Sequence, residues 1–360
     1  MTRVLHLPTC TGGMAWALAQ GEKSLGLESL VLYTESNWLD YPSDLNLHLE
    51  GANPLRKFVE RVLAFVSVRQ GYDIFHFNGG SSLLNTGKAG FPHVDLPLYP
   101  EKAKLFVSYN GCDARQKYPT LARKKVAACH DPQCYDGMCL SGRLDGIRRR
   151  NIAKMAKHVQ HMWAVNPDLL SFLPREKSSF LPYAVRMGEG PVVKPDFQSQ
   201  TLKIAHAPTN RAAKGSETIL DALERVKHQY RKKIEICLIE NVPNAKALER
   251  YREADIVVDQ IRTGWYGGFA VEAMSMGKPV ICRIEKEDLQ FVPKKMAHDL
   301  ADAVIDADQD NLVEVLLRCV EDRGFVREKA LAGIEYSRTW HDPKFVASIT
   351  KHAYENSLAR

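Results

Sequence analysis

The chain has 360 residues, of which 45% are hydrophobic and 26% are charged, which is ordinary for a globular protein of about two domains. No apolar run reaches the ~18 residues of a membrane-spanning helix, and the first 20 residues do not resemble a signal peptide. The net charge of +6 lies wholly in residues 1–190, which hold 23 Lys and Arg against 17 Asp and Glu. We therefore expect a cytoplasmic protein whose basic first half either favours anionic partners or presents a solvated basic helix face.

Short apolar strands alternate with helical segments along the first half of the chain. Strands are predicted at 4–7, 30–33, 74–77, 105–109 and 162–165, and helices at 14–25, 55–69 and 144–160. Glycine-containing turns follow three of the strands, at Gly12-Gly13, after Asn78, and after Asn110. This alternation predicts a parallel sheet with crossover helices.

The same pattern restarts in the second half. Strands are predicted at 202–207, 234–239 and 256–258, and helices at 216–226, 244–253, 312–319, 327–337 and 343–358. Ser216 is expected to cap the first of these helices. The stretch 187–199 is rich in Gly and Pro and is the predicted linker. It separates a first domain, 1–186, from a second, 187–342.

The sequence GGFAVEA places two glycines directly before a helix that carries one acid, Glu272. Gly267 and Gly268 allow a ligand to approach the backbone closely. The helix that follows presents free N–H groups and a partial positive charge, which suit a phosphate or diphosphate. Glu272 either accepts hydrogen bonds from a vicinal diol such as a ribose, or only complements the helix end.

Residues 254–280, ADIVVDQIRTGWYGGFAVEAMSMGKPV, resemble the donor-site signature of retaining GT-B glycosyltransferases, in particular glycosyltransferase family 4. The resemblance implies an α/β protein with two Rossmann-like domains whose parallel sheets face each other across a cleft. It places Glu272 on the second acid of the family's E-x7-E pair, which holds the nucleotide ribose. Gly264 stands where the family has the first acid, so the contact to the donor sugar is either absent or comes from elsewhere, with Asp259, Tyr266 or backbone amides as candidates.

Further loops agree with this resemblance and imply a donor side. Lys214 and Arg211 follow the strand at 202–207, where the family grips the donor diphosphate. Gly12 and Gly13 match the family's first loop, beside the diphosphate. The full set of expected donor-binding residues is Gly12, Gly13, Arg211, Lys214, Tyr266, Gly267, Gly268, Phe269 and Glu272.

The segment VSYNGCDAR is similar to the family loop that lines the acceptor side. Asn110 stands where relatives often have His, and Asp113 and Arg115 match. An asparagine can hydrogen-bond an acceptor but cannot serve as a general base. Asn78 is expected on the same side, and the resemblance implies that the helix at about 343–360 packs back on the first domain. The expected catalytic residues are Asn110, Asp113, Lys214 and Glu272.

The implied reaction moves a sugar from a nucleotide diphosphate sugar to a hydroxyl of a glycan or lipid-linked acceptor, with retention of configuration. No cofactor or metal is expected, and no nucleic acid partner. Two alternatives stay open: a GT-B sugar-nucleotide epimerase, and a non-catalytic nucleotide- or glycan-binding protein. The basic first half suggests contact with the inner face of a membrane.

Four potential metal ligands lie close together in the sequence, namely Cys129, His130, Cys134 and Cys139. Thiolates and imidazole suit a structural zinc ion, but the spacing is not C-x2-C. Free thiols in a loop, or one disulfide bridge formed on oxidation, are the alternative interpretations.

Overall fold

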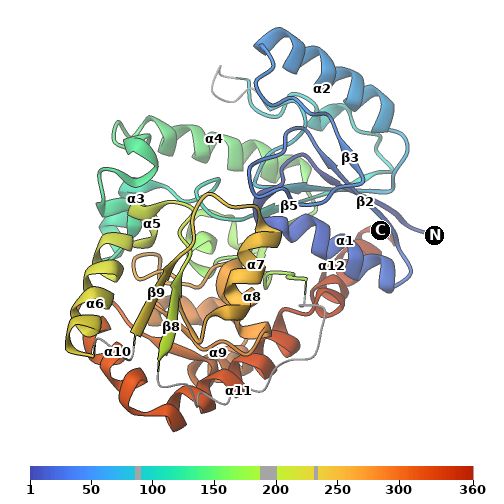
Figure 1. Ribbon diagram of the computed structural model, residues 1–360. Helices are drawn as coiled ribbons and strands as arrows, with labels where there is room; N and C mark the ends of the chain where they lie inside the picture. The colour runs from blue at the N-terminus through green and yellow to red at the C-terminus, as the bar shows by residue number, and fades with distance from the viewer. Residues whose placement is uncertain (86–90, 187–200, 231–233, 360) are drawn as a thin grey trace. The chain divides into compact units, whose positions relative to one another are not determined.

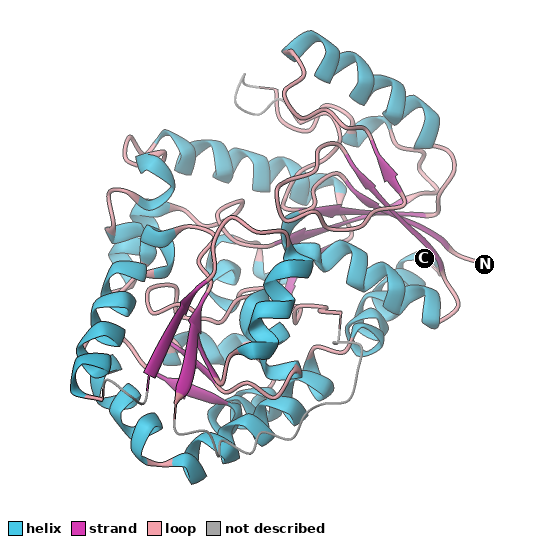
Figure 2. Ribbon diagram, viewed as in Figure 1, coloured by secondary structure: helices cyan, strands magenta, loops and turns pink. Residues whose placement is uncertain are grey.

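The computed structural model describes residues 1–85, 91–186, 201–230 and 234–359. The predicted linker at 187–199 lies outside them. The chain divides into two compact units: unit 1 is Met1–Gln116, Ser141–Val185 and Asp342–Arg360, and unit 2 is Lys117–Leu140 and Arg186–His341. Each unit contains its own parallel sheet with helices packed against it (Figures 1 and 2).

The sheet of unit 1 has seven parallel strands in the order β3-β2-β1-β4-β5-β6-β7. The strands are β1 (Arg3–Leu7), β2 (Glu28–Tyr33), β3 (Leu45–Asn46), β4 (Ile74–Asn78), β5 (Lys104–Tyr109), β6 (His161–Ala164) and β7 (Ser178–Phe180). The central strands are buried on both faces, which explains their nearly continuous apolar sequences. Leu5, Phe75 and Val107, for example, lie on adjacent strands and are all inaccessible to solvent or nearly so.

The helices of unit 1 come from the first half of the chain, apart from the C-terminal α12. They are η1 (Thr11–Gly13), α1 (Met14–Ser24), α2 (Pro54–Val68), η3 (Leu96–Leu98), α4 (Arg143–His158), η6 (Pro167–Phe172), η7 (Arg175–Lys177) and α12 (Pro343–Leu358). α12 packs directly against α1. Gly21 lies so close to the carbonyl of Pro343 that any side chain would clash, and Thr350 donates a hydrogen bond to Glu22 at 2.9 Å. α12 therefore belongs to unit 1, together with β1.

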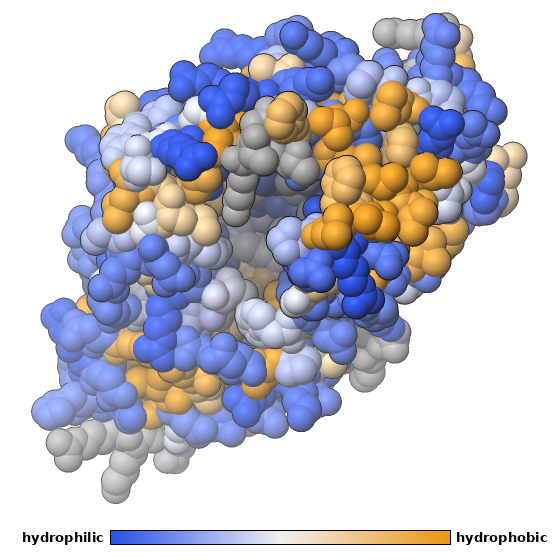
Figure 3. Space-filling view, turned by 90° about the horizontal axis from the view of Figure 1, so that it is seen from above, coloured by the Kyte–Doolittle hydropathy of each residue, from blue (hydrophilic) through white to orange (hydrophobic). Residues whose placement is uncertain are grey.

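The outer face of α2 is apolar although it faces solvent. Leu55, Leu63 and Val66 are 72%, 59% and 61% exposed, and they lie on one side of the helix because they are spaced by about whole turns. Figure 3 shows this face as a continuous hydrophobic patch over α2. The opposite side of the helix is buried in the core through Phe65 and Val68. Exposed apolar patches of this kind mark interaction surfaces.

The sheet of unit 2 has five parallel strands in the order β12-β11-β10-β8-β9. They are β8 (Leu202–His206), β9 (Ile234–Leu238), β10 (Ile256–Val258), β11 (Val280–Cys282) and β12 (Val304–Asp306). The helices are α5 (Arg211–Lys214), α6 (Ser216–Gln229), α7 (Asn244–Glu253), α8 (Gly268–Ser275), η8 (Lys286–Phe291), α9 (Lys294–Ala303), α10 (Leu312–Glu321) and α11 (Arg323–Trp340).

The prediction that Ser216 caps a helix is wrong. Gly215, in the left-handed region with φ of +80°, is the N-cap residue of α6. The Ser216 hydroxyl instead lies 2.7 Å from Nε2 of the buried His206. The serine is therefore the first residue of the helix and links it to strand β8.

The segment Lys117–Leu140 groups with unit 2, although chain order places it inside the first predicted domain. It contains α3 (Lys117–Arg123), η4 (Ala128–His130) and η5 (Cys134–Gly137). Lys124 is 8% exposed, and its ammonium lies 2.9 Å from the carboxylate of Asp288. Arg283 donates to the carbonyl of Val126 at 3.3 Å. An ion pair and a hydrogen bond thus fix this segment on unit 2.

Candidate functional site

Both sheets have a topological switch point, where the order of the strands reverses. In unit 2 it lies between β8 and β10, and in unit 1 between β1 and β4. Open parallel sheets bind ligands at the carboxyl ends of the strands, at such points. The sequence-predicted residues on loops after β8 and β10, and after β1 and β4, therefore lie where ligand sites are expected.

Asp259 is the central residue of the unit 2 site. It directly follows β10 and is fully buried. One carboxylate oxygen accepts a hydrogen bond from the Lys214 ammonium, and the other accepts one from the backbone N–H of Gly267 at 2.7 Å. Asp259 thus ties the loop after β8 to the start of α8. Because both of its oxygens are used in this way, we interpret it as a positioning residue and not as a replacement for the missing sugar-binding acid.

The start of α8 is open to a ligand. The helix begins at Gly268, no side chain caps it, and a Cβ built on Gly268 would meet no atom within 4 Å. The N–H groups of Gly268 and Phe269, in the first helical turn, have no hydrogen-bond partner among the described residues, as expected at a helix start. Lys214 has its ammonium 3.5 Å from the position that a Cβ on Gly267 would take. A cation and a helix N-terminus therefore face the same space, and an anion suits that space.

Glu272 lies one turn into α8 and is part-buried. Asn244, the first residue of α7, donates to its Oε1 at 3.1 Å. Among the described residues, Oε2 has no hydrogen-bond partner. Burial raises the pKa of Glu272 to about 7, against the lowering effects of Asn244 and Lys214. A carboxyl group with one fixed and one free oxygen is suited to accept a hydroxyl pair.

Gly264 could not hold an acid in this structure. Its φ is +80°, and a Cβ there would lie 2.9 Å from the Cβ of Glu285. Its carbonyl accepts the N–H of Glu285 at 2.8 Å. The carboxylate of Glu285 lies 2.7 Å from Arg283. The space beside residue 264 is therefore filled by an Arg–Glu pair from the loop after β11.

Three other predicted donor residues have partners inside the protein. Arg211 makes two hydrogen bonds, of 2.8 and 2.6 Å, to the carboxylate of Glu240. Tyr266 is fully buried, and its hydroxyl lies within hydrogen-bonding distance of Tyr336 and His341. The ring of Phe269 packs on Tyr251, with the Lys214 ammonium 5.9 Å from its centroid. Tyr266 therefore fixes the loop before α8 through its hydrogen bonds to Tyr336 and His341.

We use the name α8 site for Lys214, Asp259, Gly267, Gly268 and Glu272 together. The structure brings these five residues into one region at the switch point of unit 2.

In unit 1, the loop after β1 is built from left-handed glycines. Gly12 and Gly13 have φ of +63° and +65°. A Cβ on Gly13 would lie 2.5 Å from the ring of Tyr41, whereas a Cβ on Gly12 would meet nothing within 4 Å. Gly13 is therefore required for packing, and Gly12 leaves open space at the switch point.

Two asparagines of unit 1 each have one buried side-chain atom without a hydrogen-bond partner among the described residues. Nδ2 of Asn78, at the end of β4, and Oδ1 of Asn110, after β5, have no hydrogen-bond partner in the described chain. Their backbones are fixed, because Thr9 donates to the carbonyl of Asn78 at 3.0 Å and Asn166 to that of Asn110 at 2.7 Å. Buried polar atoms without partners are costly and rare, so we interpret this asparagine pair as groups that await a ligand.

Asp113 and Arg115 are both engaged within unit 1. The carboxylate of Asp113 accepts the backbone N–H groups of Asn110, Gly111 and Ala114 at 2.8, 2.6 and 3.0 Å. Arg115 makes a two-pronged pair with Asp168, at 2.6 and 2.9 Å. These residues shape the loop that carries Asn110.

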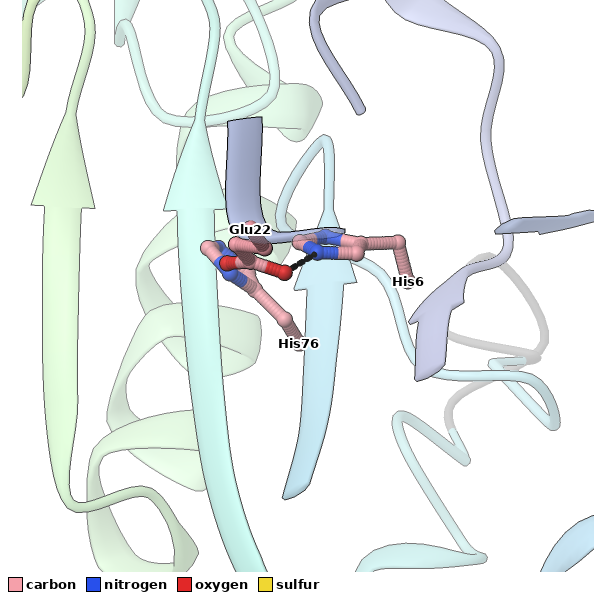
Figure 4. Close-up of side chains that lie close together, drawn as sticks. All are labelled: His6, Glu22 and His76. Atoms are coloured by element: carbon pink, nitrogen blue, oxygen red, sulfur yellow. Dashed lines mark hydrogen bonds and ion pairs between the residues drawn. The ribbon is translucent and has the colours of Figure 1, made fainter. Parts of the chain in front are cut away.

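One group of three potential metal ligands occurs in the described chain, and it is not the cysteine segment. It consists of His6, Glu22 and His76, all fully buried (Figure 4). Glu22 lies 2.8 Å from His6. Both ring nitrogens of His76 have protein partners, the hydroxyls of Tyr354 and Ser108, each at 2.6 Å. We therefore interpret this group as a hydrogen-bonded core network.

The pKa of His76 supports this interpretation. Burial, followed by the nearby His6, holds the pKa of His76 well below its usual value. Its imidazole is therefore neutral at ordinary pH. Cys129, His130, Cys134 and Cys139 form no such group among the described residues.

Sequence reasoning missed two residues of the unit 2 site. Asn244 follows Pro243 at the start of α7, and this pattern signals only a helix start. Glu285 is recognisable only when Gly264 is seen to adjoin it in space. Asp259 was considered as a sugar contact, and its bonds to Lys214 and Gly267 give it another role.

Solved structures with this fold cover nearly the whole chain. Sucrose-phosphate synthase from Thermosynechococcus elongatus has 14% identity and a TM-score of 0.64, with 100% of both chains covered. HepE from Anabaena, in complex with UDP and glucose, has 12% identity and a TM-score of 0.61, covering 99% of this chain and 100% of that one. A UDP-N-acetylglucosamine 2-epimerase has 13% identity and a TM-score of 0.55, covering 100% and 97%.

At such identities the likeness establishes the fold. The predicted class, an α/β protein with two Rossmann-like, parallel-sheet domains of the GT-B kind, is confirmed. No family model matches the sequence, and no curated protein matches it either.

Proposed function

We propose that this protein is a glycosyltransferase that uses a nucleotide diphosphate sugar as donor. The α8 site carries the proposal: the free Oε2 of Glu272, the Lys214 ammonium and the uncapped start of α8 lie together at a switch point. A nucleotide diphosphate has a ribose diol, which suits the free carboxylate oxygen of Glu272, and a diphosphate, which suits the helix N-terminus and the Lys214 ammonium. HepE, which has the same fold, binds UDP-glucose. This favours a uridine nucleotide as the donor.

The residues of the α8 site have separate tasks in this proposal. Glu272 accepts the ribose hydroxyls and fixes the nucleoside. The first N–H groups of α8 and the Lys214 ammonium hold the diphosphate. As the sugar–phosphate bond breaks, negative charge grows on the leaving diphosphate, and these groups stabilise it without having to reorganise. Asp259 keeps Lys214 and Gly267 in place throughout.

We further propose that the acceptor binds to unit 1 and that the sugar keeps its anomeric configuration. The asparagine pair offers one free donor, Nδ2 of Asn78, and one free acceptor, Oδ1 of Asn110. Such a pair can hold a sugar hydroxyl through both its oxygen and its proton. Neither amide can take up a proton, so in this proposal the leaving phosphate oxygen receives the proton of the acceptor hydroxyl.

An epimerase of nucleotide sugars is the second candidate, because a UDP-N-acetylglucosamine 2-epimerase shares the fold. That reaction requires proton transfer at carbon. The polar residues that we place at the open positions of unit 1 are amides, which favours transfer. A binding protein without catalysis is the third candidate.

A screen of UDP-, GDP- and ADP-sugars separates the three candidates. Thermal shift gives the base and sugar, since a ligand of the native state raises the melting temperature. Sugar transfer to an added glycan or lipid-linked acceptor supports the proposal. Conversion of the donor to its epimer without an acceptor supports the second candidate, and a shift without any turnover supports the third.

Glu272→Ala tests the assignment of the donor site. It removes the proposed ribose contacts and should weaken nucleotide binding about a hundredfold, because hydrogen bonds to charged groups contribute roughly 1.5–3 kcal/mol each. Calorimetry with UDP measures this directly. Asn356→Ala, at an exposed position of α12, is the control, and affinity equal to wild type for Glu272→Ala would refute the donor site.

We also propose that α2 contacts an anionic membrane surface. None of the helices in the described part of the chain has the length and apolar character that crossing a bilayer demands. Residues 54–69 instead combine the apolar outer face with four Arg and Lys against one Glu. Helices of this composition lie in the lipid interface.

Vesicle sedimentation tests the membrane contact. Wild type should sediment with phosphatidylglycerol vesicles, less with neutral ones, and Leu63→Glu/Val66→Glu should stay in solution. Both positions are exposed, so the fold should tolerate the change. Loss of a concentration-dependent dimer in the double variant, without any vesicle binding by wild type, would identify the face as a contact between copies instead.

A further inference from the structure

A pocket of about 360 Å³ lies within unit 2, beside the segment Lys117–Leu140. Its polar lining comes from Lys125, His130 and Asp131 of this segment, and from Arg262 and Gln309 of the sheet domain. None of these residues belongs to the α8 site.

The pocket lies at the ligand-binding edge of the sheet. Arg262 follows β10 and Gln309 follows β12, so both are on loops at carboxyl ends of parallel strands. The loop with Arg262 also adjoins the α8 site, because the N–H of Ile261 donates to the carbonyl of Lys214 at 3.2 Å. Arg262 itself donates to the carbonyl of Ala212 at 3.2 Å.

The charges of the pocket leave an excess of positive donors. The one carboxylate, Asp131, pairs with Nη1 of Arg262. Among the described residues, Nε and Nη2 of Arg262 and the ammonium of Lys125 have no partner. The amide of Gln309 has none in the described chain either. Two cations and one amide therefore surround a single acid that is already neutralised.

The wall of the pocket is anchored, which distinguishes it from an incidental surface hollow. Lys124 and Lys125 are neighbours in sequence but differ in burial. Lys124 is buried and paired with Asp288 at 2.9 Å, whereas Lys125 is exposed and lines the pocket. The carbonyl of Val126, the next residue, accepts a hydrogen bond from Arg283. These contacts hold Lys125 at the rim.

We propose that this pocket binds an oxyanion, a phosphate or carboxylate group carried by the substrate. Free guanidinium and ammonium donors that line an open pocket recognise such groups through charge-assisted hydrogen bonds. The inference rests on the proposed function and deepens it, since it assigns an acidic or phosphorylated sugar as the second recognised part. The position next to Lys214 places the group beside the donor, outside the diphosphate position itself.

Calorimetry with inorganic phosphate tests the pocket on the full chain. Lys125→Ala should weaken phosphate binding at least tenfold, as expected for the loss of one charge-assisted contact. Gln309→Ala should weaken it less. Lys294→Ala removes an exposed lysine of α9 outside the pocket and should bind phosphate like wild type. The double variant Lys214→Met/Asp259→Asn, which leaves no unpaired charge at Asp259, should also retain phosphate binding at the pocket.

The outcomes separate this proposal from the proposed function. If Lys214→Met/Asp259→Asn loses phosphate binding and Lys125→Ala keeps it, phosphate binds only at the α8 site and the pocket proposal is overturned. Absence of phosphate binding to wild type overturns it as well. Failure of the proposed function would appear elsewhere, as unchanged UDP binding by Glu272→Ala.

Titration with sugars identifies the source of the oxyanion. Glucose 6-phosphate and glucuronate are compared with glucose on wild type and Lys125→Ala. Binding of the phosphate ester alone assigns a phosphorylated substrate, and binding of glucuronate assigns an acidic sugar. Equal binding of neutral glucose to both proteins would contradict an oxyanion site.

Discussion

The two switch points differ in how their polar groups are satisfied. At the α8 site, Asp259 is fully buried and binds Lys214 and Gly267, so the site is held together by internal charge pairs. At the edge of unit 1, Asn78 and Asn110 are held by their backbones and leave side-chain atoms free. The first arrangement suits a ligand of fixed charge, and the second suits neutral hydroxyls. This difference predicts that the same kind of substitution will affect stability in unit 2 and activity alone in unit 1.

The largest effect is expected from Lys214→Met. It leaves the buried Asp259 carboxylate without its cation, which costs about 3–5 kcal/mol of unfolding free energy. Adding Asp259→Asn should restore much of that loss, because the uncompensated charge is removed. Urea denaturation of both variants measures the effect. A double variant less stable than Lys214→Met would show that the pair does not work in this way.

A second comparison uses two left-handed glycines. Gly264→Ala combines an unfavourable φ with a Cβ 2.9 Å from that of Glu285, and we expect a loss of about 2–4 kcal/mol. Gly12→Ala has a similar φ but open space around its Cβ, so it should cost about 1–2 kcal/mol. Melting curves of the two variants test the order, and equal losses would remove the steric role of Glu285.

The third prediction concerns pH. The pKa of Glu272 is raised from 4.5 to about 7 in the folded chain, so the folded state binds this proton more tightly than the unfolded state. Its effect is therefore to lower the unfolding free energy as pH rises from about 4.5 to 7, by at most about 1.4 kcal/mol per pH unit. Glu272→Gln should remove this slope.

The difference between wild type and Glu272→Gln in urea denaturation, measured at pH 5 and pH 8, isolates the carboxyl from other titrating groups. A difference that does not change with pH would show that Glu272 has an ordinary pKa. Nucleotide binding should strengthen over the same range, because the ionised carboxylate is the better acceptor.

The smallest effect on stability is expected in unit 1. Asn110→Ala removes a side-chain oxygen that has no partner, so unfolding free energy should change by less than about 0.5 kcal/mol. Acceptor-dependent turnover should fall about tenfold or more, while UDP affinity stays the same. A stability loss above that size would mean that the amide has an internal structural role.

The architecture, and the position of the glycines and Glu272 at the start of α8, could be predicted from sequence because their signals are local. Strand and helix periodicity gave the two sheets, and the glycine pair before Glu272 indicated the start of α8. Spatial relations had no such signal. The partner of Arg211 is Glu240, 29 residues away, and the burial of Tyr266 depends on Tyr336 and His341.

The grouping of Lys117–Leu140 with unit 2 was equally hidden from sequence. It depends on Lys124 meeting Asp288, which is 164 residues away. No periodicity or spacing in one sequence reports such a pair. The same holds for Glu285, which adjoins Gly264 in space. It occupies the position that a side chain at residue 264 would take.

The packing of α12 against α1 has a consequence for biosynthesis. His76 in β4 lies within hydrogen-bonding distance of Tyr354, and Glu22 in α1 accepts a hydrogen bond from Thr350, so unit 1 draws part of its core from residues that are translated after unit 2. Domains usually fold in order as the nascent chain emerges from the ribosome. Here the first domain must wait for the second to be synthesised, and its unfinished core is exposed to chaperones and proteases during that time.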